Sequence, residues 1–375
     1  MKKVVIAIDS FKGCLPSAEA GKAAAEGIRS VYPECEVICL PIADGGEGML
    51  DVLIMATNGQ EVPISAHDPL MRWCNTYYGI SENGETAFIE MASISGLPLV
   101  PPERRNPMLT TTYGTGEIIR DALERGCRNF IIGIGGSATN DAGLGMLQAL
   151  GFRFSDKEGK KVGTGCGEVL IKVAHIDSTF VHPALNSCRF TVACDVQNPF
   201  YGPEGAAYVF APQKGADREM VEALDAGLQN FAEVIRHTTG KDISHHPGAG
   251  AAGGMGGSLL AFLNAELKPG IQLMLEALDF SNKIKSADLI ITGEGKADRQ
   301  TLMGKVPSGI LAEARKQNIP VILLAGNIED SDELQQAGFE GVFSVNPPFI
   351  SLEEAMRPEV ARKNIQQTVE SICKK

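Results

Sequence analysis

The strongest constraint on the fold is a unit that recurs along the chain: a short apolar run, a carboxylate with glycine nearby, and then a stretch of helical spacing. Residues 4–8 form such a run, which ends at Asp9 and precedes the alanine-rich stretch 17–30. Residues 37–43 form another, which ends in Asp-Gly-Gly-Glu-Gly and precedes helical spacing over 49–56. Short β-branched runs that alternate with helices predict a parallel sheet.

The pattern changes in the middle of the chain. Residues 75–80 and 85–90 alternate in character and flank an Asn-Gly turn, which predicts an antiparallel hairpin. Residues 152–155 and 160–162 flank a second glycine turn and are expected to pair in the same way. The middle region is therefore expected to mix helices with antiparallel and buried strands.

The first pattern returns near the C-terminus. Apolar runs predict strands over 288–292, 321–324 and 342–345, and helical spacing predicts helices over 308–316, 334–337 and 355–373. We therefore expect an α/β protein in which residues 1–62 and 286–375 form one doubly wound, mainly parallel sheet domain of flavodoxin or Rossmann type. Residues 63–285 are expected to be inserted as a second, mixed α/β domain, with the active-site cleft between the two.

Composition and charge exclude several classes of protein. The chain carries 34 Lys and Arg against 46 Asp and Glu, a net charge of −12, which disfavours nucleic acid and anionic membranes as partners. No apolar run approaches the length of a membrane span, and Asp9 interrupts the first run too early for a signal peptide, so a cytoplasmic location is expected. The nine Cys show no CxxC pair and the six His no zinc spacing, so any metal is expected to have oxygen ligands.

The candidate chemistry lies where strands end. Carboxylates and glycines follow predicted strands at Asp9, Asp44, Asp195, Glu294 and the Gly-Gly-Ser loop at 135–137. In an open α/β sheet the carboxyl ends of the strands face the ligand crevice, so we expect these groups to converge on one cavity. Glycine amides, carboxylates for Mg²⁺ and lysines that neutralise charge are the parts that phosphoryl transfer requires.

Other interpretations remain open at this point. Gly248, Gly250 and Gly253 match a dinucleotide-binding spacing, which would suit an NAD(P)-dependent oxidoreductase of a small hydroxy acid, but no strand precedes them. A non-catalytic two-domain protein that binds a small ligand is a third class. A ribokinase-like kinase would need an aspartate where Ala251 stands, and Val306 after Gly304-Lys305 excludes a Walker A loop.

Several co-linear motifs strongly resemble the bacterial glycerate kinase family of type I. They are Asp-Ser-Phe-Lys-Gly at 9–13, Ala-Asp-Gly-Gly-Glu-Gly at 43–48, Gly-Gly-Ser-Ala-Thr-Asn-Asp-Ala-Gly at 135–143, Cys-Asp-Val-Gln-Asn-Pro at 194–199, the glycine run at 247–258, and Thr-Gly-Glu-Gly-Lys-Ala-Asp at 292–298. The resemblance implies ATP-dependent, Mg²⁺-assisted phosphorylation of D-glycerate, with 2-phosphoglycerate as the product in most bacterial members of this type; the sequence leaves open whether the 2- or the 3-hydroxyl is phosphorylated. It leaves open whether the chain forms a homodimer.

Individual roles follow from the chemistry as hypotheses. Lys12 and Lys296 would neutralise phosphate charge, and Asp195 or Asp298 would accept the proton of the glycerate hydroxyl. Mg²⁺ would be held by three carboxylates: Asp44, Glu47 and Glu294. Substrate or phosphate would be bound by a larger set: Asp9, Ser10, Gly45, Gly46, Gly135, Gly136, Ser137, Asn140, Asp141, Asn198, Gly253 and Gly254.

Overall fold

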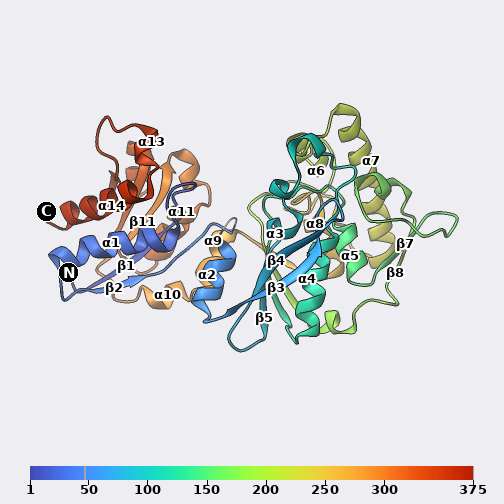
Figure 1. Cartoon of the computed structure of the whole chain (residues 1–375), viewed down its shortest axis with the longest axis horizontal. Coiled ribbons are helices and arrows are strands. Elements are labelled where there is room, and N and C mark those ends of the chain that lie inside the picture. The colour runs from blue at the N-terminus through green and yellow to red at the C-terminus, as the bar shows by residue number, and fades with distance from the viewer. Residues whose placement is uncertain (46–47, 375) are drawn as a thin grey trace. The chain divides into compact units, whose positions relative to one another are not determined.

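The computed structural model describes residues 1–45 and 48–374, which form two compact units (Figure 1). Unit 1 consists of Met1–Asp44 and Ile271–Lys375, and unit 2 of Gly45–Gly270, so unit 2 is inserted into unit 1. The predicted boundaries at 62/63 and 285/286 are both too late in the chain. Helix α2 (Met49–Ala56) belongs to unit 2, because its Ile54 packs where Gly79 has no side chain.

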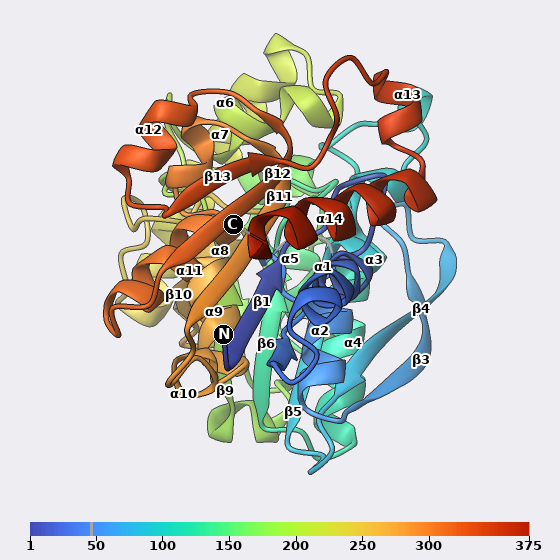
Figure 2. The same ribbon diagram turned by 90° about the vertical axis from the view of Figure 1, so that its left-hand side faces the viewer.

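Unit 1 is built on a five-stranded parallel sheet in the order β13-β12-β11-β1-β2 (Figure 2). The strands are β1 (Lys3–Ile8), β2 (Glu36–Cys39), β11 (Leu289–Ala297), β12 (Val321–Ile328) and β13 (Gly341–Ser344). All four strand pairs are parallel. The chain places β2 on one side of β1 and β11 on the other, which confirms the expected doubly wound fold.

Helices cover the sheet of unit 1. They are α1 (Ser17–Val31), α9 (Gly270–Ala277), α10 (Phe280–Lys283), α11 (Val306–Arg315), α12 (Ser331–Gln336), α13 (Leu352–Ala355) and α14 (Pro358–Cys373), with the 3-10 turn η6 (Arg299–Leu302). Helices α1 and α14 lie side by side and share a core with Val4, Ile6 and Ile8 of β1. A Cβ atom at Gly27 of α1 would be 2.5 Å from the carbonyl oxygen of Gln366, so glycine allows the two helices to approach.

Unit 2 contains a six-stranded mixed sheet in the order β10-β9-β6-β5-β4-β3. The strands are β3 (Gln60–His67), β4 (Trp73–Ile80), β5 (Thr86–Glu90), β6 (Asn129–Gly133), β9 (Arg189–Ala193) and β10 (Glu266–Lys268). Strands β5, β6, β9 and β10 run parallel, whereas β4 pairs antiparallel with both β3 and β5. This mixture, together with the parallel sheet of unit 1, agrees with the expected fold class.

The remaining elements of unit 2 surround that sheet. The helices are α2, α3 (Ala92–Ser95), α4 (Tyr113–Glu124), α5 (Leu144–Ala149), α6 (Ala206–Phe210), α7 (Arg218–Thr239) and α8 (Met255–Phe262). The 3-10 turns are η1 (Leu97–Leu99), η2 (Pro102–Arg104), η3 (Gly167–Lys172), η4 (Pro183–Ser187) and η5 (Pro212–Lys214). A two-stranded antiparallel sheet joins β7 (Arg153–Ser155) to β8 (His175–Asp177).

Three expected elements differ from the observed ones. Strand β7 pairs along its length with β8, whereas 160–162 forms no strand; its predicted pairing with β7 is present in a short form, as the antiparallel Ser155–Lys161 bridge and a hydrogen bond from the Val162 N–H to the Phe154 carbonyl. Strand β11 continues to Ala297, because β12 supplies hydrogen-bonding partners beyond Thr292. The expected helix 355–373 is interrupted before Pro358, which has no backbone N–H and suits the first turn of α14.

None of the helices formed by the described residues is long and apolar enough to cross a membrane.

Candidate active site

The carboxyl ends of β1 and β11 form the switch point of unit 1: the chain adds β2 on one side of β1 and later adds β11 on the other side. Strands β1 and β11 are neighbours, with Ile8 opposite Gly293, so Asp9 follows one strand while Glu294 lies on the next. Ligands of doubly wound sheets bind at such a switch point. The topology therefore brings residues that are far apart in the sequence to one place.

A cavity of about 330 Å³ lies at this edge, entirely within unit 1. It is lined by Asp9, Ser10, Phe11, Lys12, Cys14, Asp44, Glu294, Gly295, Lys296, Lys305, Gly326, Asn327, Val345, Asn346, Leu352, Ala355, Met356 and Ala361. Six residues that the sequence proposed for the site are therefore brought together: Asp9, Ser10, Lys12, Asp44, Glu294 and Lys296. We call this cavity the strand-end pocket.

Asp9 is the most strongly perturbed carboxyl group of the strand-end pocket. It is buried, and its Oδ1 accepts a hydrogen bond of 2.7 Å from the Ser10 N–H. Burial raises the pKa of Asp9 to about 7, with a further increase from the charge of Asp44. Lys12 opposes this shift without cancelling it, so Asp9 is easier to protonate than an exposed aspartate.

Glu294 is held in place by two neighbours that the sequence did not single out. Its Oε1 accepts a 2.6 Å hydrogen bond from the Thr301 hydroxyl, and its Oε2 lies 3.6 Å from Lys305 Nζ. Burial raises the pKa of Glu294, while both neighbours act in the opposite direction. Lys305 lines the pocket and also stands at the N-cap of α11, next to the amides of the first helical turn.

The other two lysines of the pocket are more exposed. Lys12 Nζ lies 3.7 Å from Asp44 Oδ2, and Lys296 Nζ lies 3.0 Å from Glu329 Oε2. Exposed ion pairs of this kind contribute little to stability, so both ammonium groups can turn toward a ligand at small cost.

Asp298 does not line the strand-end pocket in the described structure. Its Oδ1 accepts the Gln300 N–H at 2.8 Å, and its backbone N–H donates to Thr301 Oγ1, which together cap η6. Burial acts to raise the pKa of Asp298, but the Gln300 N–H and the ammonium groups of Lys305 and Lys296 outweigh it, so the pKa is lowered. Asp298 is therefore a capping residue and a poor proton acceptor, contrary to the sequence-based hypothesis.

Unit 2 has its own row of strand ends. Gly133 of β6 is opposite Ala193 of β9, and Ala193 is opposite Lys268 of β10. Beyond these residues lie the exposed Gly135 and Gly136, and Asp195, whose Oδ1 accepts the Gly270 N–H at 2.8 Å. Asp195 therefore belongs to unit 2, outside the lining of the strand-end pocket.

Beneath the loop that follows β6 lies a lysine that the sequence did not reveal. Lys214 is 2% exposed, and its Nζ donates to Ser137 Oγ at 2.8 Å and to the Thr139 carbonyl oxygen at 2.6 Å. Burial lowers the pKa of Lys214 to about 7, and the charge of Asp141 opposes the shift. Ser137 is therefore oriented by a buried amine. Lys214 lies in the segment 212–215, which belongs to no motif that the sequence analysis identified.

Two predicted substrate-binding residues are inaccessible. Asp141 is completely buried and accepts hydrogen bonds from the N–H and hydroxyl of Thr112, the Gly143 N–H and the Gly145 N–H. It holds its loop together and cannot touch a substrate. Asn140 is also completely buried, and neither polar atom of its side chain has a hydrogen-bond partner among the described residues.

Three predicted phosphate-binding glycines serve close packing instead. A Cβ at Gly45 would lie 2.5 Å from Gly270 Cα, and one at Gly253 would lie 2.1 Å from the Thr139 carbonyl oxygen. Gly254 is buried, its N–H donates to the Gly250 carbonyl, and a Cβ there would lie 3.0 Å from Leu228 and Phe200. No strand precedes this run, so the dinucleotide-binding interpretation also loses its structural basis.

Three more predicted residues complete the comparison. Asn198 of unit 2 is half-buried, and its side chain donates to the Glu204 carbonyl at 2.8 Å; it does not line the strand-end pocket. Gly46 and Glu47 lie outside the described residues.

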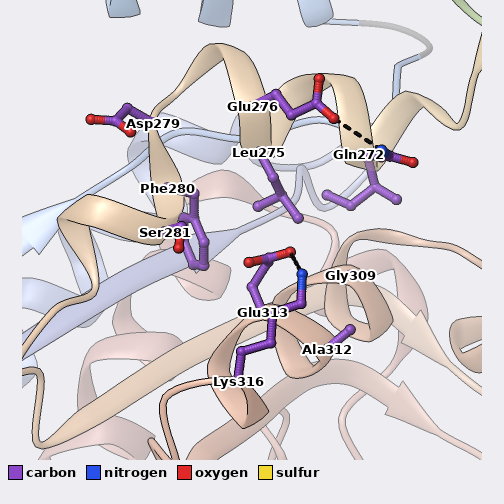
Figure 3. Close-up of a pocket in the computed structure, with 11 residues that line it drawn as sticks. Gln272, Leu275, Glu276, Asp279, Phe280, Ser281, Gly309, Ala312, Glu313 and Lys316 are labelled. Atoms are coloured by element: carbon purple, nitrogen blue, oxygen red, sulfur yellow. Dashed lines mark hydrogen bonds and ion pairs between the residues drawn. The ribbon is translucent and has the colours of Figure 1, made fainter.

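A larger cavity of about 490 Å³ lies between the helices of unit 1 (Figure 3). Its walls come from α9, α10 and α11, and include Leu275, Phe280 and Ala312. Lys316 pairs with Glu313, and Gln272 donates to Glu276 at 2.9 Å, so these polar side chains already have partners. No residue that the sequence proposed for the site lines this cavity.

Comparison with known proteins shows which family the chain resembles. The model of the glycerate kinase family matches residues 4–375. The glycerate kinase of Bacillus subtilis is 46% identical over 99% of this chain and 97% of its own length. The glycerate 2-kinase of Escherichia coli is 47% identical over 95% of this chain and 93% of its own length. A Salmonella typhimurium LT2 crystal structure assigned as glycerate kinase 2 matches with a TM-score of 0.91 and 44% identity, covering 100% of this chain and 97% of that one.

Proposed function

This chain belongs to the glycerate kinase family, and from that premise we propose that it transfers the γ-phosphoryl group of ATP to a hydroxyl group of D-glycerate. The observation that carries the proposal is the strand-end pocket, where three carboxylates and three lysines from distant segments line one cavity at the switch point of a doubly wound sheet. Neither an oxidoreductase nor a passive binding protein requires this combination. ATP as the phosphoryl donor also accords with a cytoplasmic location.

The phosphates of ATP are assigned to the lysines of this pocket. Positive charge comes from Lys12, Lys296 and Lys305. Lys305 is also the N-cap residue of α11, so the backbone amides at the start of this helix lie next to it. Phosphoryl transfer depends on positioning and on stabilising charge at the phosphate oxygens, which is what these groups provide. Lys305 extends the pair of lysines expected from the sequence.

The carboxylates of the pocket fit Mg²⁺. The donors are oxygens, and Asp44 already raises the pKa of Asp9 through its negative charge, which a divalent cation would offset. No cluster of three or more His, Cys, Asp or Glu side chains in 1–45 and 48–374 is arranged to hold a metal alone. Mg²⁺ at such sites is usually held by one or two carboxylates together with substrate phosphates, and Asp44 and Glu294 would serve. When bound, the ion neutralises charge on the transferring phosphoryl group.

Glycerate is assigned to the strand ends of unit 2. The exposed Gly135 and Gly136 are glycines whose amides would bind its carboxylate, next to Ser137 oriented by Lys214. Asp195 is exposed and would accept the hydroxyl proton. Because the Escherichia coli relative is a glycerate 2-kinase, we assign the 2-hydroxyl as the acceptor. The expectation of an active-site cleft between the domains stays a prediction.

The proposal is tested with the full chain, ATP, Mg²⁺ and D-glycerate in an assay that follows ADP release. We expect turnover, with 2-phosphoglycerate identified by phosphorus NMR of the product. Lys12→Met should reduce kcat/KM by about a hundredfold or more, whereas Lys22→Met, an exposed lysine of α1 outside the pocket, should not. The absence of ADP release with glycerate would refute the proposed function.

A further inference from the structure

The lining of the strand-end pocket falls into two sets by origin. Carboxylates and lysines come from the ends of β1 and β11, from Asp44 in the loop after β2, and from the start of α11. Apart from Phe11 in the loop after β1, the large apolar part of the lining comes from Val345 after β13, from Leu352 and Ala355 of α13, and from Met356 and Ala361. The phosphates and the metal account for the first set only. The apolar set needs a separate explanation.

The two sets belong to one continuous wall. Cys14 Sγ, in the loop after β1, lies 3.9 Å from the Ala355 carbonyl oxygen. A Cβ atom at Gly13 would lie 3.4 Å from Met356 Cε, so the end of α13 rests on the same loop that carries Asp9 and Lys12. A ligand bound to the lysines therefore has the apolar set within reach.

The apolar set is unusually exposed for its chemistry. The side chain of Leu352 is 79% exposed and that of Met356 is 38% exposed, although both line the cavity. Nearby Phe349 is fully exposed and has a φ of 68°, a left-handed conformation that bulky residues rarely adopt. Exposed large apolar side chains beside a polar cavity are typical of a binding surface for a ligand with an apolar part.

Of the two proposed substrates, ATP and glycerate, only ATP has an apolar part. Glycerate consists of three carbons that carry a carboxylate and two hydroxyls, so it gains nothing from Leu352 or Met356. ATP carries a planar purine ring whose faces suit contact with aliphatic and thioether side chains. The cavity of about 330 Å³ also lies within the range of roughly 300–1,000 Å³ that small-molecule and cofactor sites occupy.

We propose that the segment 345–356, which carries Leu352 and Met356 in its C-terminal part, is the purine-binding wall of the strand-end pocket. This proposal rests on the proposed function, because it takes ATP as the ligand. The purine ring lies against α13, and the triphosphate extends toward Lys12 and Lys305. The wall therefore sets the affinity for the nucleotide and makes no contact with glycerate.

The test uses two probes that both carry three linked phosphates: the non-hydrolysable ATP analogue AMP-PNP, which also carries adenosine, and inorganic tripolyphosphate, which does not. For Leu352→Gln and Met356→Gln, singly and together, we expect the Kd of AMP-PNP and the KM of ATP to rise by about tenfold in the double variant, the ratio that corresponds to about 1.4 kcal/mol. The inhibition constant of tripolyphosphate, kcat and the KM of glycerate should stay within about twofold. Met303→Gln is the matched control, because Met303 is 77% exposed in unit 1 but does not line the pocket.

Two outcomes would overturn the proposal: an unchanged AMP-PNP affinity in the double variant, or equal losses of AMP-PNP and tripolyphosphate binding. The proposed function and the purine-binding wall can fail separately. If the wild-type chain binds AMP-PNP more tightly than tripolyphosphate but does not phosphorylate glycerate, the proposed function is refuted and the purine-binding wall is not. Hydrogen exchange of the wild-type chain is a measurement that needs no variant. AMP-PNP should slow exchange over 345–356 while tripolyphosphate should not, and equal protection by both probes would also contradict the proposal.

Discussion

Lys214 should make the stability of unit 2 depend on pH in a way that one substitution removes. In the unfolded chain its ammonium has a pKa of 10.5, whereas burial lowers the value to about 7 in the folded state. Between these two values the unfolded chain holds a proton that the folded chain has released. The free energy of unfolding should therefore rise with pH in this window and stay level, for this group, below pH 7.

The magnitude follows from the two pKa values. A difference from 10.5 to about 7 corresponds to about 5 kcal/mol across the whole window, or about 1.4 kcal/mol per pH unit inside it. Lys214→Met keeps the length of the side chain but removes the titrating group. It also removes the hydrogen bonds to Ser137 and Thr139, which shifts the stability of the variant by an amount that does not depend on pH.

The measurement is urea unfolding at several pH values from 7.5 to 9.5, followed by the fluorescence of Trp73. Trp73 is the single Trp of the chain and belongs to unit 2. Its ring centroid lies 4.1 Å from that of His67 with the rings tilted by 35°, and loss of this contact on unfolding should change its emission. The wild-type minus variant difference should increase by about 1.4 kcal/mol per pH unit. Lys22→Met, a substitution of an exposed lysine, should run parallel to the wild type. Parallel curves for the wild type and Lys214→Met would refute the reasoning.

Three further predictions concern packing, proton transfer and metal. Gly27→Ala should lower the free energy of unfolding by about 1–3 kcal/mol, because its Cβ would meet the Gln366 carbonyl. Gly21→Ala in the same helix would make ordinary contacts and should raise the free energy of unfolding by up to about 1 kcal/mol. Changes of the same sign in both variants, measured by urea unfolding, would contradict this. In steady-state assays Asp195→Asn should lower kcat by about a hundredfold or more and leave the KM for ATP unchanged. Asp298→Asn still caps η6, so its kcat should stay within about tenfold of the wild-type value. Near-normal turnover of Asp195→Asn would rule out Asp195 as the proton acceptor. EDTA should abolish ADP release and added Mg²⁺ should restore it, so full turnover in the chelator would rule out the metal assignment.

The parts of the site that could be predicted from the sequence are those where a strand end fixes the position of a side chain. Asp9 directly follows β1 and Glu294 lies on the neighbouring β11, so the parallel order alone places them together. The apolar runs that define these strands are local signals. For the same reason the doubly wound fold of unit 1 could be predicted from the pattern of runs and helices.

The failures occurred where the same residue type serves two purposes. Glycine at 253 and aspartate at 141 occur in loops that resemble anion-binding loops, but tertiary packing buries both. Nothing in the local sequence distinguishes a glycine that admits a phosphate from one that admits a carbonyl oxygen. Lys214 and Lys305 acquire their roles only from distant partners, Ser137 and Glu294, so no spacing rule finds them.

The domain boundaries were missed for a related reason. The apolar face of α2 is compatible with either sheet, and tertiary contacts assign the helix to unit 2, among them the packing of Ile54 on Gly79 and the hydrogen bond from the Leu50 N–H to Glu90. Strand β3 then pairs with β4 along its whole length, from Gln60 opposite Ile80 to His67 opposite Trp73. The composition of the chain does not change at the true boundary near residue 45.

The contact between Gly45 and Gly270 brings the two ends of the inserted unit together. These two residues are the first and last of unit 2, and their backbones touch, so the insert enters and leaves at a single point. An insert with adjacent ends can be excised, with a short glycine bridge joining residue 44 to residue 271, while the order of the five strands in the host sheet is preserved.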